Sequence, residues 1–372
     1  MGVRTSTTID YRLRPRWVER TRCLTEDRPG DPVRLLRVLA AARTSGVLVL
    51  DGTSRVDKVA TAILARTRRG PEVLVVDCSW KLGPGRLVEL VTRAGVRAMA
   101  GPRTTFVALT REGRVQFSRV HRVPGDWVVS VPWHHGLGPD DLAGALDPTG
   151  GPDPTGSPDP TGSPQRSDGP AGAEPEIRHD GPVFSGGRTA RDYRPLLGCA
   201  ADLPEGTEVV IATVPGGLPQ GVPVPANVHV RTEVDPPAFR RDLRRACVVV
   251  VALEHRDDCA PGIMVLLDAM ALGKLTVVTD TLGVREHVEQ GVTGFVVPAG
   301  DAAALGETLR WCLDPAHAAE AADIRESARA TARTAYAPEV HVEALLEQVG
   351  RALERAEARR GQSSRAVPNT SS

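Results

Sequence analysis

Residues 245–301 limit most strongly what this chain can fold into. Residues 246–253 (ACVVVVAL) form a continuous apolar, β-branched run, which is typical of a strand buried on both faces of a parallel sheet. A Pro-Gly pair then opens residues 263–272, an apolar segment that is too long for a typical strand and predicts a helix. Residues 275–280 predict the next strand. This alternation predicts two successive β–α turns of an open α/β sheet.

Asp268 lies inside this predicted helix, among Met, Val, Leu and Ala. Burying an unpaired carboxylate is costly, so the side chain must face a cleft, pair with a cation or bind a ligand. The purely structural alternative is a solvent-facing turn or a local ion pair with Lys274 or Arg245. Because ligands bind open α/β sheets at the edge where strands end and helices begin, the pattern favours a binding role for Asp268.

The composition bounds the class of protein. A chain of 372 residues exceeds a single usual core and predicts two domains. Lys plus Arg equals Asp plus Glu at 46 each, and aromatic residues are 3% of the chain, so neither a nucleic-acid partner nor an acidic membrane surface is indicated. No apolar run approaches the roughly 20 residues of an integral membrane segment, and no signal peptide is evident. Six cysteines without metal-ligand spacing predict reduced thiols and a cytoplasmic location.

The first third of the chain alternates short apolar strands with amphipathic helices. This pattern predicts a first doubly wound parallel sheet, preceded by residues 1–31, which have no sustained period and are expected to be irregular or weakly stranded. The predicted strands are 47–51, 72–77, 106–109 and 128–131, and the predicted helices are 32–44, 56–68 and 85–94.

The composition changes sharply between residues 137 and 180. Asp-Pro-Thr-Gly occurs three times at six-residue intervals, with Pro, Gly and Ser between the repeats. Such a tract lacks the apolar surface to offset its ordering entropy, which predicts a disordered linker. Calcium ligation is the alternative, but one carboxylate in six residues beside a rigid proline is a poor cage for six to eight oxygen ligands.

A glycine turn follows the linker. Residues 183–187 (VFSGG) predict a strand that ends in Gly186 and Gly187, with Arg188 and Arg191 directly after it. Backbone N–H groups in such a turn, beside arginines and a helix N-terminus, suit a pyrophosphate. The alternative is that these arginines are a solvated helix start.

Several segments of the second half together resemble a known family. Residues 268–274 (DAMALGK), 277–280 (VVTD), 283–286 (GVRE) and 289–301 (EQGVTGFVVPAGD) are similar, in order, to the donor-binding half of glycosyltransferase family 4, the glycosyl transferases group 1. This resemblance implies the GT-B fold of retaining enzymes, an α/β fold with two Rossmann-like doubly wound parallel-sheet domains facing a cleft.

The resemblance also implies a division of the chain. The N-terminal, acceptor-side domain is expected at 1–136 and the linker at 137–180. The nucleotide-sugar-binding domain is expected at 181–337, followed by a C-terminal helix at 338–360 and a disordered tail at 361–372. A stripe of apolar residues in the last helix is expected to pack as core.

Two charged residues of the site follow from the resemblance. Asp268 stands where the family has the glutamate that binds the ribose hydroxyls of the donor. Arg191 stands in the place of the lysine of the family's diphosphate motif, and we expect it to act as the catalytic residue by stabilising the departing diphosphate.

Further contacts are expected around these two residues. Backbone groups at the start of the helix that carries Asp268 remain available for phosphate or sugar oxygens, and two histidines after a strand of the first domain are possible acceptor or cleft contacts. The predicted donor contacts are Gly186, Gly187, Arg188, Gly262, Ile263 and Met264, and the possible acceptor contacts are His134 and His135.

The chain departs from the family at residue 260. The family has a glutamate there that lies against the donor sugar, and this chain has Ala260. Glu254, Asp257 and Asp258 are the loop acids that can replace it. The resemblance implies a metal-independent glycosyltransferase with a nucleotide-sugar as substrate, no cofactor and an unidentified acceptor. The alternatives are a catalytically inactive GT-B binding or scaffold protein and a GT-B sugar epimerase.

Overall fold

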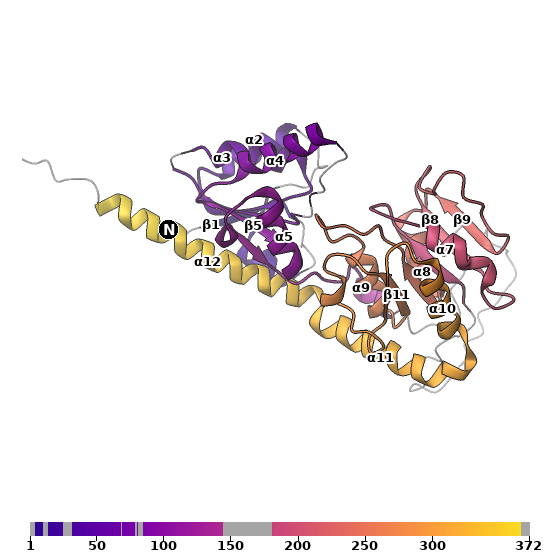
Figure 1. Cartoon of the computed structure of the whole chain (residues 1–372). Helices are drawn as coiled ribbons and strands as arrows, with labels where there is room; N and C mark the ends of the chain where they lie inside the picture. The colour runs from indigo at the N-terminus through magenta and orange to yellow at the C-terminus, as the bar shows by residue number, and fades with distance from the viewer. Residues whose placement is uncertain are drawn as a thin grey trace, which may run out of the picture.

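The computed structural model describes residues 4–9, 14–24, 32–67, 69–78, 80, 85–143 and 181–365. These residues form two six-stranded parallel sheets with helices on both faces, which confirms the predicted doubly wound α/β architecture (Figure 1). Of the segments predicted to be a disordered linker and tail, residues 139–143 form a short helix and residues 361–365 continue the last helix, so the predicted bounds 137–180 and 361–372 were too wide. Residues 144–180 and 366–372 lie outside the described residues.

The first sheet has the strand order β2-β1-β3-β4-β5-β6. Its strands are β1 (Arg4–Thr7), β2 (Arg22–Cys23), β3 (Ser45–Asp51), β4 (Glu72–Val76), β5 (Thr104–Ala108) and β6 (Val128–Ser130). The accompanying helices are α1 (Pro15–Arg20), α2 (Pro32–Ala41), α3 (Arg55–Leu64), α4 (Arg86–Met99), α5 (Arg111–His121), the 3₁₀ turn η1 (Gly125–Trp127) and α6 (Pro139–Ala143).

The second sheet has the order β12-β11-β10-β7-β8-β9. Its strands are β7 (Val183–Gly186), β8 (Val209–Thr213), β9 (Val228–Thr232), β10 (Val248–Val251), β11 (Leu275–Thr279) and β12 (Phe295–Val297). The helices are α7 (Arg194–Cys199), α8 (Pro236–Arg245), α9 (Ile263–Ala271), α10 (Ala302–Leu313), α11 (Ala318–Ala335) and α12 (Pro338–Arg365), with 3₁₀ turns at η3 (Ala200–Asp202), η4 (Val284–Glu286) and η5 (Pro315–His317).

Strand β1 is an inner strand of the first sheet, next to the edge strand β2, although its residues are polar. Thr5, Ser6 and Thr7 are buried, and the strand pairs in parallel with both β2 and β3. Threonine is β-branched and suits a pleated strand, while Ser6 Oγ hydrogen-bonds Ser45 Oγ at 2.9 Å. The segment that the sequence left as irregular or weakly stranded is therefore a strand whose hydroxyls are paired.

Helix α5 was not predicted from the sequence, which gave no element between the strands predicted at 106–109 and 128–131. Thr110 is its N-cap, and the Thr110 hydroxyl accepts a hydrogen bond from Gly113 N at 2.9 Å. Only Phe117 and His121 are buried among its described side chains, so the helix has a weak apolar stripe. Because so few apolar residues recur at helical spacing, the sequence of α5 only weakly indicates a helix.

Helix α12 leaves the second domain and packs on the first. Its buried Val342, Leu345 and Val349 share a hydrophobic cluster with Val49 of β3 and Leu74 of β4. The helix runs along the face of the first sheet opposite α2, α3 and α4 (Figure 1). The prediction that the last apolar stripe packs as core is confirmed for Leu345 and Val349. Among the described residues, no helix has the length and apolarity needed to cross a membrane.

Candidate functional site

The strand order of the second sheet reverses between β7 and β10. The chain first adds β8 and β9 on one side of β7, and then adds β10, β11 and β12 on its other side. Ligands of open α/β sheets bind at such a switch point, beyond the carboxyl ends of the strands. Strand β7 ends there at Gly186, where a Cβ would lie 2.5 Å from the Phe239 ring. Gly187 follows with φ of 140°, and a Cβ on it would lie 2.2 Å from Nη2 of Arg191. A side chain at 186 would displace the Phe239 ring, and one at 187 would displace the Arg191 guanidinium and strain the backbone.

Arg191 lies across this glycine turn. Its Nε donates to Gly186 O at 3.0 Å and its Nη1 to Thr189 O at 3.2 Å, while its backbone bridges to Leu253 after β10. Burial lowers the pKa of Arg191. Within the described part of the chain no carboxylate lies within ion-pair distance of this guanidinium. The positive charge at the switch point is held by carbonyl dipoles and has no anionic partner there.

Helix α9 begins against the same guanidinium. Gly262 is its N-cap with φ of 76°, and a Cβ at this position would lie 3.0 Å from Arg191 Nη1. The first-turn N–H groups of Ile263 and Met264 have no partner within the helix. A helix N-terminus next to a cation is a site for a phosphate or another anion. The structure thus brings together Gly186, Gly187, Arg191 and the start of α9, as the sequence predicted.

Arg188 is exposed in the glycine turn. No hydrogen bond or ion pair ties its side chain to another described residue, so nothing fixes its direction. Its predicted donor contact stays a prediction.

Asp268 lies almost two turns into α9 and faces the connection between the domains. Its Oδ1 accepts a hydrogen bond from Gly136 N at 2.6 Å. The alternative of an ion pair with Lys274 or Arg245 is not found, since Lys274 Nζ donates to Arg244 O instead. Burial raises the pKa of Asp268 to about 7. In this conformation the carboxylate predicted to bind ribose is engaged by the first domain's last turn.

The loop between β10 and α9 contains the position at which the chain departs from the family. Arg256 donates to both carboxylate oxygens of Asp258, at 2.8 and 2.7 Å, and lies 3.6 Å from Glu254. These contacts raise the pKa of Arg256. The Asp257 side chain is 82% exposed. Asp257 is therefore the loop acid most available to a ligand.

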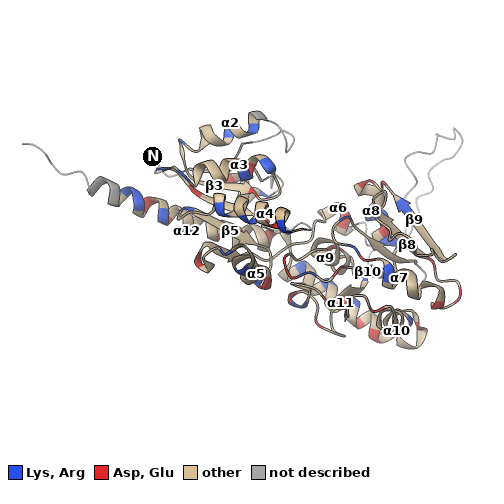
Figure 2. Cartoon of the chain, turned by 45° about the horizontal axis from the view of Figure 1, so that its top comes forward, with Lys and Arg blue, Asp and Glu red and all other residues tan. Residues whose placement is uncertain are grey.

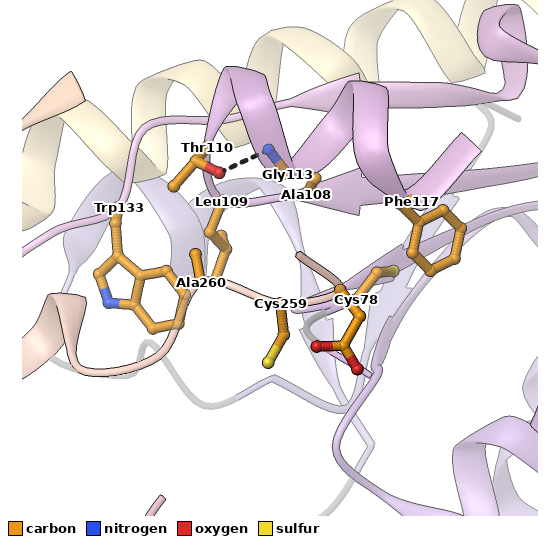
Figure 3. Close-up of a pocket in the computed structure, with 10 residues that line it drawn as sticks. Cys78, Ala108, Leu109, Thr110, Gly113, Phe117, Trp133, Cys259 and Ala260 are labelled. Atoms are coloured by element: carbon orange, nitrogen blue, oxygen red, sulfur yellow. Dashed lines mark hydrogen bonds between the residues drawn. The ribbon is translucent and has the colours of Figure 1, made fainter. Parts of the chain in front are cut away.

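Ala260 faces a small crevice between the domains. Residues after β4 and β5 of the first domain form one wall, and the β10–α9 loop forms the other (Figure 3). Trp133, Thr110 and Ala260 lie around its opening, with Cys259 below them (Figure 3). The lining residues are Cys78, Ala108, Leu109, Thr110, Gly113, Phe117, Trp133, Asp258, Cys259 and Ala260.

A second crevice, of about 380 Å³, opens at the carboxyl ends of β10, β11 and β12. Two of its charges form an ion pair, because Arg285 binds Asp280 with an Nη2–Oδ2 distance of 2.7 Å. The His255 ring lies 3.4 Å from the Asp257 carboxylate. The lining residues are Glu112, His255, Asp257, Asp280, Thr281, Leu282, Arg285, Pro298 and Ala299.

Glu286 and Glu112 join the two domains in a way that the sequence analysis did not foresee. The Glu286 carboxylate accepts from Arg111 N at 2.8 Å and from Glu112 N at 2.6 Å, at the N-terminus of α5. Glu112 in turn accepts from Gly283 N at 2.8 Å. The sequence gave part of the signal for this contact, because residues 283–286 belong to the segments that resemble the family. The contact itself could not be predicted, because helix α5, which Glu286 binds, had not been predicted.

His134 and His135 lie in the connection between the domains. The His135 residue is 2% exposed, and its backbone N–H donates to the backbone carbonyl of Tyr336 at 3.0 Å. The His134 ring lies 4.6 Å from that of His341, whose Nδ1 lies 2.7 Å from Pro132 O. Burial lowers the pKa of His135 to about 4. These contacts make both histidines part of the connection between the domains. Their predicted contact with an acceptor stays a prediction.

Residues 209–315, from β8 to the turn after α10, match the family model described as Glycosyl transferases group 1. The resemblance predicted from the sequence is confirmed over this part of the chain. No curated protein matches the sequence.

Solved structures match nearly the whole chain at low identity. HepE from Anabaena, in complex with UDP and glucose, has a TM-score of 0.60 and 14% identity, covering 89% of this chain and 86% of that one. Sucrose-phosphate synthase from Thermosynechococcus elongatus has a TM-score of 0.58 and 16% identity, with coverages of 90% and 84%. WaaG, a glycosyltransferase involved in lipopolysaccharide biosynthesis, has a TM-score of 0.54 and 14% identity, with coverages of 87% and 85%. The fold is the GT-B fold of glycosyltransferases.

Proposed function

We propose that this protein is a glycosyltransferase that moves a sugar from a nucleotide-sugar donor to an acceptor bound between the domains. The observation that carries the proposal is the uncompensated guanidinium of Arg191 at the start of α9, at the switch point of the second sheet. A diphosphate supplies the negative charge that this arrangement lacks. The UDP bound to HepE, a protein of the same fold, supports a donor of this class.

The chemistry follows from where charge develops. As the bond between the anomeric carbon and the diphosphate oxygen breaks, negative charge grows on the departing phosphate. Arg191 and the first N–H groups of α9 stabilise that charge more strongly in the transition state than in the ground state. In this proposal these groups stabilise the departing phosphate by themselves. The proposed reaction therefore uses neither a metal ion nor another cofactor.

Asp268 can bind the donor beside its present partner. Its carboxylate accepts one hydrogen bond, from Gly136 N to Oδ1. A carboxylate offers about four acceptor positions, so Oδ2 and the second lone pair of Oδ1 remain for two ribose hydroxyls. We also propose that the configuration at the anomeric carbon is retained during transfer and that the protein is cytoplasmic.

Ala260 favours a second candidate, an inactive nucleotide-sugar-binding protein. The crevice beside Ala260 has no carboxylate at that position, and Asp258 next to it is neutralised by Arg256. Such a protein retains the anion site at Arg191 and lacks the acid that lies against the sugar.

Thermal shift with UDP-, GDP- and ADP-sugars, followed by donor hydrolysis assays, tests both candidates. An enzyme shows a shift together with turnover, whereas a binding protein shows a shift alone. Arg191→Gln should abolish the shift, and Arg241→Gln, at an exposed arginine of α8, should preserve it. If Arg191→Gln binds every donor as well as the parent protein does, the assignment of the site is wrong.

A further inference from the structure

Exposed aliphatic side chains gather on three neighbouring helices of the first domain. Eight of the fourteen large hydrophobic residues that are most exposed among the described ones lie on α2, α3 and α4, which pack side by side on one face of the sheet (Figure 1). We call the solvent side of these helices the α2–α4 outer surface. Its aliphatic residues are Val33, Leu36, Val59, Ile63, Leu87, Val88, Leu90 and Val91.

Helix α4 presents its apolar side to solvent. Leu87 is 73% exposed and Leu90 and Val91 are each 63% exposed, whereas Val96 and Met99 on the opposite side are buried. A surface helix of a soluble domain normally has the reverse arrangement, with a polar outer face. Scattered exposed aliphatics need no explanation, but a contiguous set across three helices marks an interaction surface.

The same helices carry an excess of positive charge. The sequences of α2, α3 and α4 contain seven Lys and Arg residues against two acids, which is 7 − 2 = +5, in a chain whose net charge is zero. The two acids are already paired, Asp57 with Arg34 and Glu89 with Arg93. Arg86 and Arg97 are exposed at the two ends of α4. In Figure 2 the ribbon is blue at the Lys and Arg positions of α2 and α4.

We propose that the α2–α4 outer surface binds the surface of an anionic lipid bilayer. Aliphatic side chains that enter the headgroup boundary, flanked by arginines that contact lipid phosphates, form the usual pattern of an interfacial helix. Overall neutrality of the chain hid this feature, because the excess of cations on these helices is balanced elsewhere.

Two other occupants fit the surface less well. A second copy in a symmetric dimer would place the same positive surface against itself, and like charges oppose that pairing. The longest segment outside the described residues, 144–180, has only Leu146 and Ile177 as large aliphatic residues, too few to cover eight exposed ones.

The location of α4 links this surface to the cleft. Helix α4 follows β4 and therefore begins at the carboxyl edge of the first sheet. Cys78 and Thr110, at that same edge, line the crevice beside Ala260. A bilayer bound to α4 therefore lies next to the mouth of the cleft.

Vesicle flotation of the full chain tests the proposal. Vesicles of phosphatidylcholine are compared with vesicles that also contain phosphatidylglycerol, at low and high salt. We expect binding only with the anionic lipid, and weaker binding as salt rises. Arg86→Gln with Arg97→Gln should lower the partition coefficient about thirtyfold, because each basic side chain contributes about 1 kcal/mol at an anionic surface. Leu87→Ser with Leu90→Ser should lower it at least about tenfold.

Matched controls separate this effect from general changes. Val115→Ser, 66% exposed on α5, controls for the leucines, and Arg241→Gln with Arg360→Gln controls for the arginines. All variants should keep the parent's far-ultraviolet circular dichroism and melting temperature, since the replaced side chains are exposed. The proposal is overturned if the parent does not prefer anionic vesicles or if the controls lose binding equally. It is also overturned if light scattering shows a dimer that the leucine variant splits while no vesicle binds.

Discussion

The two domains have the same type of sheet, yet their switch points are filled in opposite ways. In the first domain the switch lies between β1 and β3, and in the second it lies between β7 and β10. The first is occupied by the protein's own ion pair, with both partners buried. The second holds a cation without an anionic partner among the described residues. Topology places the two sites, and charge compensation decides which one can bind a ligand.

In the first domain, the carboxylate of Asp57 pairs with the cation at the switch point. Arg34 donates to it with Nε at 2.9 Å and Nη2 at 2.8 Å, and both side chains are almost fully buried, at 4% and 1% exposure. Thr8, directly after β1, and Asp51 N, at the end of β3, donate to the same carboxylate. The guanidinium here is already paired with the protein's own carboxylate, so it leaves no free charge for a phosphate.

The first prediction addresses this ion pair and has the largest expected effect. Asp57→Ala leaves the Arg34 guanidinium buried without a partner, so it should lower the free energy of unfolding by about 3–5 kcal/mol. Denaturant unfolding of the full chain measures this. Replacing both partners, with Arg34→Met and Asp57→Leu, should recover most of the loss. If Asp57→Ala has the same unfolding free energy as the parent, the ion pair does not stabilise the first switch point, and the contrast with the second is wrong.

Arg191→Gln should show the reverse behaviour. Because Arg191 has no carboxylate partner in the described structure, we expect the unfolding free energy to change by less than about 1 kcal/mol. Donor turnover should fall by about 100- to 1000-fold, as when one oxyanion-stabilising donor is removed. Parallel unfolding and hydrolysis measurements with Arg241→Gln as the control sharpen the contrast. A loss of stability as large as that of Asp57→Ala would show that both switch points are structural.

Asp268→Asn tests the carboxylate at the domain connection through pH. The pKa of Asp268 is about 7 in the folded protein and 3.8 ordinarily, so the folded state binds the proton more tightly. The stability from this proton is fully present below about pH 4 and is lost as pH rises through about 7. Asn still accepts the Gly136 hydrogen bond and does not titrate, so the variant should exceed the parent by on the order of 1–2 kcal/mol above pH 7. Denaturant unfolding of parent and variant at pH 4 and pH 8 measures this, and a difference in unfolding free energy between them that is the same at both pH values would contradict it.

Glu286→Gln should have the smallest effect. It removes the negative charge at the N-terminus of α5 and keeps one acceptor for Arg111 N, so the loss should be about 0.5–1 kcal/mol. Small-angle scattering should also report a slightly more open arrangement of the domains. Glu307→Gln, on α10 away from the domain contact, provides the control. An unchanged scattering profile together with unchanged stability would show that this contact does not hold the domains.

The sequence was most informative where side chains repeat with a clear period. The valine run of β10 and the apolar helix α9 were predicted within a few residues of their observed bounds, because burial on both sides demands apolar residues throughout. Strand β1 and helix α5 gave weak signals. Their stability depends on partners such as Ser45 and Glu286, which are distant in sequence.

The site was predicted in part for the same reason. Gly186, Gly187, Arg191 and Gly262 meet because each follows a strand end of one parallel sheet, which the order of elements already implies. The partner of Asp268 was not predictable, since Gly136 reaches it only when the two domains assemble.

The amino-acid sequence by itself determined two doubly wound sheets, the glycine turn after β7 and the cation that lies across it, because these depend on local periodicity and on strand order. Only the tertiary structure decided which charges are compensated. It buried Asp57 against Arg34, tied Asp268 to the domain connection and turned the apolar side of α4 outward. Pairing of charges and exposure of faces depend on distances between segments remote in the chain, and no local pattern encodes those distances.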